Sequence, residues 1–179
     1  MQAPLLFSGT SNRTLSASVA KLLGTTLGAV EITRFMDNEC RVWVKDDVAN
    51  KNVFVLQSLS MIADQHLVEL CLIGQALKQV KVGKATAIIP WMGYSKQDKE
   101  FRKGEAVSAS LVAKFIEAAG FDAVITVELH SEHITPYFRV PMTRLSTHQL
   151  FAQKLSKLKV SGDIVVVSPD QGGKSRSEQ

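Results

Sequence analysis

The feature that most constrains the fold is the stretch of residues 84–105, in which a short apolar run ends at a proline and a charged loop follows. Ala85–Ile89 is apolar and partly β-branched, a pattern typical of a buried strand. After the loop we expect a helix from near Glu105 to Gly120, a helix-ending glycine. Because open α/β sheets bind ligands beyond the carboxyl ends of their parallel strands, the loop is a candidate ligand site.

This loop is rich in side chains that bind anions and bases. Its cations can contact phosphate oxygens, Gln97 can hydrogen-bond a base edge or a hydroxyl, and Asp98 can act on a metal or orient a cation. The cations are Lys96, Lys99, Arg102 and Lys103, and the aromatic residues able to stack on a base are Trp91, Tyr94 and Phe101. A solvated charged loop explains the same composition, so the position at a strand end is what favours ligand binding.

Length and composition set the class of protein. The chain has 179 residues, enough for one domain or a little more, and 45% of them are hydrophobic. Its 21 basic and 17 acidic residues are interspersed and give a net charge of +4, which fits an anionic small molecule better than a nucleic acid. No apolar stretch reaches the length of a membrane span, and the N-terminus has no export signal, so we expect a soluble, cytoplasmic protein without membrane partners.

The two cysteines, Cys40 and Cys71, are isolated and do not share a metal-type spacing. In a cytosolic chain they are predicted to be buried free thiols rather than a disulfide.

The remaining elements follow from hydrophobic periodicity and from turn and cap residues. Strands are predicted at Leu5–Phe7, Val30–Phe35, Arg41–Val44, Val53–Gln57, Ala123–Leu129 and Asp163–Val167. Helices are predicted from a cap at Ser11 or Asn12 to Gly24, from a cap at Asp64 to Val80, and over residues 147–158. Thr135–Pro141 is predicted to be an irregular crossing, because its prolines break helices.

Three short motifs carry competing interpretations. Asp37 and Glu39, in the turn FMDNE, are explained by ordinary turn chemistry or by a solvated strand end. The sequence His130-Ser131-Glu132-His133, preceded by Glu128, suggests zinc, but no further strong ligand is spaced nearby, which favours one functional or merely packed histidine.

The third motif is Gly173-Lys174-Ser175, which resembles the end of a P-loop. The glycine that a P-loop requires would stand at position 168, where the chain has serine, and Pro169 removes a backbone donor. Four residues follow Ser175, too few for a crossover helix, so a P-loop is disfavoured.

The segment IIPWMGYSKQDKEFRKGEAVSASLVAKFIEAAG resembles the ATP-binding region of the ribose-phosphate pyrophosphokinase family, which usually reads P-Y-x-x-Y-[AS]-R-Q-D before a basic stretch and a helix. The resemblance implies that Lys96, Gln97 and Asp98 hold ATP. Lys96 stands where the family usually has arginine, and Trp91 where it usually has tyrosine. Lysine keeps the charge of arginine and loses its planar two-point contact.

The turn FMDNE is similar to the F-x-D-G-E of that family, whose hairpin reaches the ATP site of a neighbouring subunit. The resemblance implies that Phe35 packs on adenine and that Asp37 and Glu39 accept from its amino group or orient the loop. Asn38 replaces the usual glycine, and asparagine tolerates the left-handed backbone that glycine adopts.

The resemblance also implies a magnesium site. The family strand ends in D-L-H, so His130 is expected at the Mg²⁺ of Mg-ATP, while Glu128 replaces the usual aspartate. The segment VVSPDQGG matches a second family motif, in which Asp170 is expected to hold magnesium. Because Mg²⁺ prefers oxygen ligands and keeps several waters, the contact with His130 is expected to run through water.

Taken together, the resemblance implies an α/β fold, a phosphoribosyltransferase-like parallel sheet flanked by helices with a small hairpin, followed by a truncated second domain. Residues 1–145 are expected to form the N-terminal ATP-binding domain, and residues 146–179 the start of the second domain. The implied reaction is ATP plus ribose 5-phosphate to 5-phosphoribosyl 1-diphosphate plus AMP, carried out with Mg²⁺ by a homo-oligomer.

This chain, which holds no catalytic residue of its own, is expected to be an inactive fragment. The alternative is a non-catalytic nucleotide-binding or assembly module of the same fold. A phosphoribosyltransferase is disfavoured, because no acidic pair followed by a Thr/Gly phosphate loop occurs in the chain.

Overall fold

The computed structural model describes residues 4–158 and 165–168 of the chain. By its contacts the chain divides into two compact units, Met1–Leu145 and Ser146–Gln179, and each is described separately.

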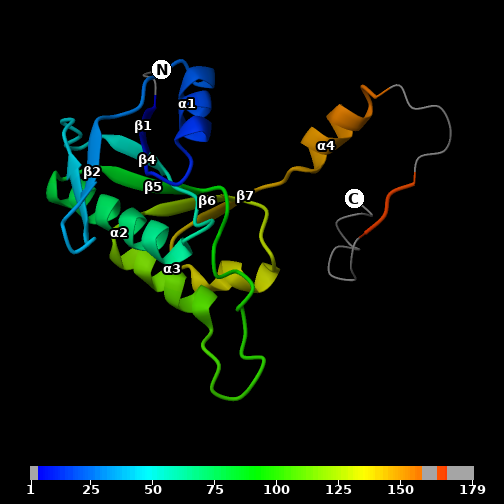
Figure 1. Ribbon diagram of the computed structural model, residues 1–179. Coiled ribbons are helices and arrows are strands. Elements are labelled where there is room, and N and C mark those ends of the chain that lie inside the picture. Colours follow the sequence, from blue (N-terminus) through cyan, green and yellow to red (C-terminus); the bar gives the residue numbers. More distant parts are fainter. Residues whose placement is uncertain (1–3, 159–164, 169–179) are drawn as a thin grey trace. The chain divides into compact units, whose positions relative to one another are not determined.

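The first unit is built on a five-stranded sheet in which every pair of neighbouring strands is parallel (Figure 1). The strands are β1 (Leu5–Ser8), β4 (Asn52–Leu56), β5 (Lys84–Ile89), β6 (Ala123–Val127) and β7 (Met142–Leu145), in the order β1-β4-β5-β6-β7. Parallel strands buried on both faces read as continuous apolar runs, as β5 does with Ala85, Ala87 and Ile89 fully buried. The prediction of a parallel α/β sheet is confirmed.

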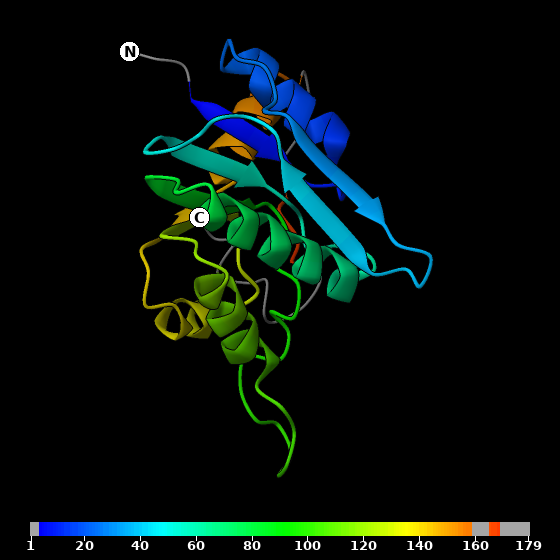
Figure 2. The same ribbon diagram turned by 90° about the vertical axis from the view of Figure 1, so that its left-hand side faces the viewer.

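Helices cover both faces of this sheet (Figure 2). They are α1 (Arg13–Leu22), α2 (Ala63–Gln79) and α3 (Ser108–Ala118). Successive strand residues point to opposite faces: Leu6 packs in a small cluster with Ala20 of α1, while Phe7 packs in the main core. That core also holds Leu70 of α2 and Ile116 of α3, so these two helices share the face opposite α1.

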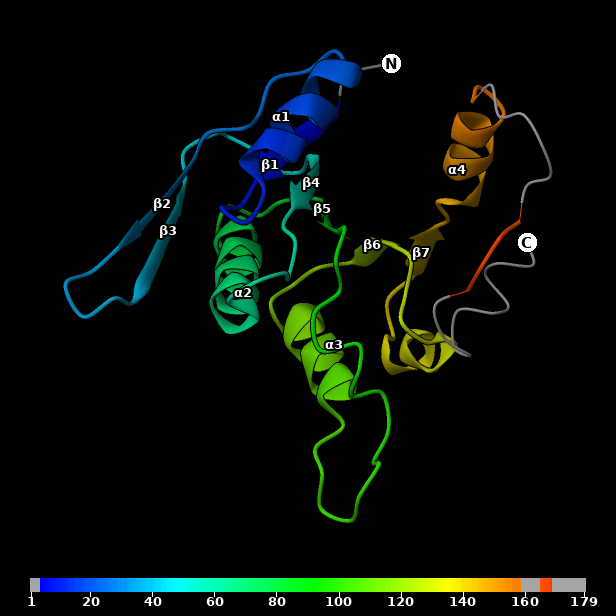
Figure 3. The same ribbon diagram turned by 45° about the vertical axis from the view of Figure 1, so that its right-hand side comes forward.

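The predicted hairpin is also present, as a separate two-stranded antiparallel sheet of β2 (Val30–Arg34) and β3 (Cys40–Val44). Val44 is buried and Val42 packs against the core, whereas Trp43 remains 54% exposed. Asn38 in the turn has a φ of 72°, the left-handed conformation expected of it. Figure 3 shows the tip of the hairpin projecting from the first unit.

Two helix starts differ from the predictions. The helix after the charged loop begins at Ser108 rather than near Glu105, because Glu105 donates its backbone N–H to Arg102 O in a turn of the loop. Asp64 does not cap α2: the cap position is Ile62, with a φ of 46° and no side-chain cap bond. Asp64 instead lies in the first turn, and its carboxylate accepts a hydrogen bond from the Tyr94 hydroxyl.

The predicted irregular crossing at Thr135–Pro141 is partly wrong. Pro136 lies inside a 3₁₀ helix, η1 (Glu132–Tyr137), whose last turn is closed by the N–H of Phe138 on Thr135 O at 3.2 Å. The edge strand β7 was not predicted, since Met142–Leu145 is short and mostly exposed.

In the second unit the predicted helix over residues 147–158 is shorter, α4 (His148–Leu155), and none of its side chains is buried. The predicted strand Asp163–Val167 is wrong for the residues that the structure describes, because Val165, Val166 and Val167 are exposed and have no regular structure. A strand needs a neighbour to pair its backbone groups. Asp163, Ile164 and Asp170 lie outside the described residues. In the part of the chain that the structure describes, no helix is both long and apolar enough to cross a membrane.

Candidate functional site

Three loops that follow the carboxyl ends of neighbouring parallel strands contain unusual backbone conformations. We call this side of the sheet, where the strands end, its carboxyl edge. Non-glycine residues with positive φ follow β4, β5 and β6: Ile62 at 46°, Tyr94 at 62° and Glu128 at 49°. Such conformations cost free energy and cluster at functional sites, where the surrounding structure enforces them. This edge, to which the sequence assigned the ligand loop, is therefore the candidate site.

The segment after β5 is fixed from several sides. Gln97 accepts at two atoms from the start of α3: its backbone oxygen from Ala109 N at 3.2 Å and its Oε1 from Ser108 Oγ at 2.5 Å. The Tyr94 hydroxyl ties the same segment to Asp64 of α2. Lys96 and Gln97 remain exposed, so their side chains are available to a ligand.

Asp98 differs from its two neighbours because it is only 5% exposed. The pKa of Asp98 lies below its ordinary value, chiefly because hydrogen bonding by the nearby Ser131 side chain favours the charged carboxylate. Burial opposes that shift, and the positive charges of His133 and Lys99 add to it. The Tyr137 hydroxyl donates to the backbone oxygen of Asp98 at 2.6 Å. Both partners of Asp98 lie after β6.

The loop after β6 presents its histidines outward. His130 and His133 are exposed, and Ser131 caps η1 by accepting from His133 N at 3.1 Å. Glu132 pairs with the guanidinium of Arg144. Within residues 4–158 and 165–168, no group of three or more His, Cys, Asp or Glu side chains is placed to hold a metal ion.

The far part of the loop, residues 99–107, reaches away from the sheet (Figure 1). Phe101 is 59% exposed, and the Lys99 ammonium lies 5.3 Å from the centre of its ring. Trp91, at the start of the loop, is 57% exposed. Of the aromatic and cationic side chains named from the sequence, all but the half-buried Tyr94 are thus exposed.

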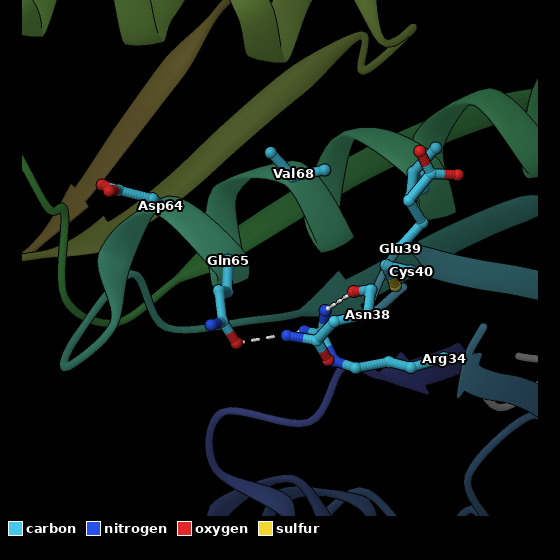
Figure 4. A pocket seen from close by; sticks show the side chains of 8 residues that line it. Arg34, Asn38, Glu39, Cys40, Asp64, Gln65 and Val68 are labelled. Carbon is cyan, nitrogen blue, oxygen red and sulfur yellow. Dashed lines mark hydrogen bonds between the residues drawn. The ribbon is translucent and has the colours of Figure 1, made fainter. Parts of the chain in front are cut away.

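The turn of the hairpin is held by Arg34, as Figure 4 shows. Its Nη1 donates to Asn38 O at 2.8 Å and its Nη2 to Gln65 Oε1 of α2 at 3.2 Å. Asp37 accepts from Glu39 N at 3.1 Å, the turn chemistry that the sequence indicated, and Phe35 is 54% exposed.

A cleft of about 420 Å³ lies between the hairpin and α2. It is lined by Arg34, Asn38, Glu39, Cys40, Asp64, Gln65, Val68 and Leu72. In all three ribbon views the hairpin tip and the charged loop project in different directions, so within one chain the turn does not face the loop (Figures 1, 2 and 3).

The structure thus brings Asp98 beside Ser131, the neighbour of His130, while Phe35, Asp37 and Glu39 lie apart on the hairpin. Sequence reasoning missed Ser131, Tyr137 and Asp64 as neighbours of the segment that is expected to bind ATP. Their signal is weak, because each is an ordinary polar residue whose contact spans a long sequence separation.

A parallel five-stranded sheet, helices on both faces and a small antiparallel hairpin define an α/β protein of the phosphoribosyltransferase-like class. Residues 4–120 match the family model of the N-terminal domain of ribose phosphate pyrophosphokinase. The chain belongs to this family.

Individual relatives carry the name of the same family. The chain is 37% identical over 175 residues to the ribose-phosphate pyrophosphokinase of Thermosipho africanus and 39% identical over 173 residues to that of Mesorhizobium japonicum. These alignments cover 97% and 96% of this chain but 55% and 56% of the relatives, so the chain spans about half of their length.

Among solved structures, the phosphoribosylpyrophosphate synthetase of Mycobacterium smegmatis superposes with a TM-score of 0.93 at 33% identity, covering 99% of this chain and 59% of that one.

Proposed function

We propose that this chain is the Mg-ATP-binding part of a ribose-phosphate diphosphokinase. The observation that carries the proposal is the exposed Lys96-Gln97 pair, held at the carboxyl edge of a parallel sheet in a chain of this family. Lys96 supplies a cation for phosphate oxygens, and Gln97 supplies an amide for the nucleoside. Asp98, whose side chain is buried, is the third residue of the same binding segment.

The adenine is proposed to lie against the hairpin of a second copy. Phe35 is exposed and offers a face for stacking, while the acceptors Asp37 and Glu39 flank the same turn. Because the turn and the charged loop of one chain project apart, a complete site of this kind needs two chains. A homo-oligomer is therefore part of the proposal.

Magnesium is proposed to arrive on the phosphates of ATP. The described residues offer no oxygen-rich cage, and Mg²⁺ commonly binds through substrate phosphates, waters and one or two protein groups. His130, exposed beside Ser131, and Asp170 are the groups proposed to contact it. When bound, the ion neutralises phosphate charge.

For the whole protein we propose transfer of the β,γ-diphosphoryl group of ATP to ribose 5-phosphate. The anomeric hydroxyl attacks the β-phosphorus, its proton is lost, and AMP leaves as the bond from the β-phosphorus to its α-bridging oxygen breaks. Positioning and charge neutralisation supply catalysis of this kind.

Residues 146–179 are proposed to open a second domain that carries the ribose-phosphate site. We therefore propose that the 179-residue chain alone makes no product. The rival proposal, a non-catalytic nucleotide-binding or assembly module, is not favoured, because the relatives are named as pyrophosphokinases.

A cytoplasmic location belongs to the same proposal, supported by Cys40 and Cys71, which are free thiols in the described residues.

Calorimetry with Mg-ATP tests the proposal. We expect saturable binding that weakens about tenfold in Lys96→Ala, the loss of one charge-assisted contact. Lys114→Ala is the matched control, because it removes an exposed lysine of α3 outside the site. No binding at millimolar Mg-ATP would overturn the assignment, and 5-phosphoribosyl 1-diphosphate made by the purified chain would overturn its proposed inactivity.

A further inference from the structure

The backbone of Gln97 is fixed at both of its polar groups. Its N–H donates to Tyr94 O at 3.1 Å, and its carbonyl oxygen accepts from Ala109 N of α3 at 3.2 Å. The second of these bonds closes the base of the projecting loop over residues 99–107. The remaining freedom of Gln97 therefore lies in its side chain.

The first residue of α3 restricts that side chain as well. Ser108 Oγ donates to Gln97 Oε1 at 2.5 Å, across the base of the same loop. A serine at the start of a helix commonly caps it. The cap position of α3, however, is Val107, which makes no side-chain cap bond. The Ser108 hydroxyl thus contacts Gln97 instead of capping its own helix.

This contact determines which end of the Gln97 amide faces a ligand. Oε1 and Nε2 leave the same planar carbon in different directions, so Nε2 points away from Ser108 when Oε1 accepts from it. Among the described residues, Nε2 has no hydrogen-bond partner, and the side chain of Gln97 is exposed. The group that Gln97 offers to a ligand is therefore a hydrogen-bond donor.

We propose that Ser108 is a positioning residue, which holds the Oε1 of Gln97 against α3 and so presents the Nε2 of Gln97 as a donor to an acceptor atom of the nucleoside. A side chain that is ordered before binding loses less conformational entropy when the ligand arrives. The proposal rests on the proposed function, because it assigns that donor to a site for Mg-ATP.

Variants of the 179-residue chain test the proposal. Ser108→Ala removes the hydroxyl and leaves the backbone bond between Ala109 and Gln97 in place, so it changes the side-chain contact alone. Ser108→Thr keeps the hydroxyl. The matched control is Ser18→Ala, which removes a serine hydroxyl bonded to Thr14 O at 2.9 Å in α1, outside the site. Thermal unfolding shows that each variant is folded, and Ser108→Cys, a weak donor, replaces Ser108→Ala if that variant is not.

A titration tests the direction of the hydrogen bond without any nucleotide. Gln97→Glu places a carboxyl where the amide stands. Because a donating Ser108 hydroxyl stabilises the charged carboxylate, we expect the pKa of this carboxyl to rise by about half a pH unit when Ser108→Ala is added. Ser108→Thr and Ser18→Ala should leave it unchanged. An equal pKa with and without the Ser108 hydroxyl, measured by carbon-13 NMR, would overturn the orientation.

Mg-ATP affinity, measured by calorimetry, shows whether Ser108 acts through Gln97. We expect about fivefold weaker binding in Ser108→Ala, the effect of releasing one ordered side chain, and recovery in Ser108→Thr. In a Gln97→Ala background the same change should have no effect, because the side chain that Ser108 positions is absent. Unchanged affinity in Ser108→Ala, or equal weakening in both backgrounds, would contradict positioning. If the wild-type chain does not bind Mg-ATP, the proposed function fails, and the titration alone decides how Gln97 is oriented.

Discussion

Gln57 and Glu69 are hydrogen-bonded to each other inside the core: Gln57 Nε2, just after β4, donates to Glu69 Oε1 of α2 at 2.7 Å. Glu69 is 1% exposed and Gln57 is fully buried. The same carboxylate accepts from Thr10 N and from Thr10 Oγ1, each at 2.7 Å, so it also anchors the loop after β1. A carboxylate this buried is stable only when such donors surround it.

Replacing Glu69 is therefore expected to be costly. Glu69→Ala leaves the donors of Gln57 and Thr10 without their acceptor in a buried place, and we expect a loss of about 3 kcal/mol in the free energy of unfolding. Urea denaturation measures it. Gln75→Ala, at an exposed position of the same helix, is the control and is expected to change stability by less than about 0.5 kcal/mol. Equal urea midpoints for the two variants would contradict this role of Glu69.

Arg34 is expected to matter for the hairpin and little for global stability. Arg34→Ala removes the bonds to Asn38 O and to Gln65, both at the surface, so we expect less than about 1 kcal/mol of destabilisation. The backbone amides of residues 35–39 should exchange faster, because the turn loses its tie to α2.

Arg41→Ala is the matched control for this hairpin prediction. Arg41 is an exposed arginine of the partner strand, paired with Thr33 in the register of the hairpin. Hydrogen exchange that is equally fast in both variants would mean that Arg34 does not hold the turn.

Much of this fold could be predicted from local patterns. The apolar run of β5, the Asn12 side chain that caps α1 by accepting from Leu15 N, and Gly120 after α3 are encoded within a few residues. β7 was missed because an exposed edge strand has little hydrophobic signal. The extent of α4 was overestimated because periodicity indicates a helical face and not where the helix ends.

For the candidate site, too, local features could be predicted from the sequence and contacts between distant residues could not. Its position after β5 followed from the sequence, as did the exposure of Lys96 and Gln97 in a charged loop. The burial of Asp98 did not, because an aspartate among lysines reads as a surface residue. Ser131 caps the 3₁₀ helix after β6 and Tyr137 ends it, and contacts between separate loops are set by tertiary packing.

Cys71 is expected to be a slow nucleophile. Burial raises the pKa of its thiol to about 11, so at pH 8 only about one thiol in a thousand is ionised. Alkylation by iodoacetamide, followed by mass spectrometry in a Cys40→Ser background, should accelerate about tenfold per pH unit between pH 8 and 10. Fast labelling at pH 8 in the folded protein, matching the rate in urea, would contradict it.

The raised pKa of Cys71 also determines the direction in which protein stability changes with pH. A thiol whose pKa is higher in the folded state contributes stability that is fully present below its ordinary value of 9.0 and is lost as the pH rises toward about 11.

The titration of Asp98 tests how strongly the Ser131 side chain favours its charged form. In the wild-type chain the pKa of Asp98 lies below its ordinary value of 3.8, chiefly because Ser131 stabilises the charged form. This carboxylate therefore contributes stability that is present above the ordinary pKa and is lost as the pH falls through the lower, folded value.

In Ser131→Ala the largest lowering influence is gone, while burial still favours the neutral acid, so the pKa of Asp98 should rise. Carbon-13 NMR of the side-chain carboxyl measures it directly. Ser131→Thr should restore the low value, and Ser18→Ala should leave it unchanged. A pKa that stays low in Ser131→Ala would mean that His133 and Lys99 hold the charge by themselves.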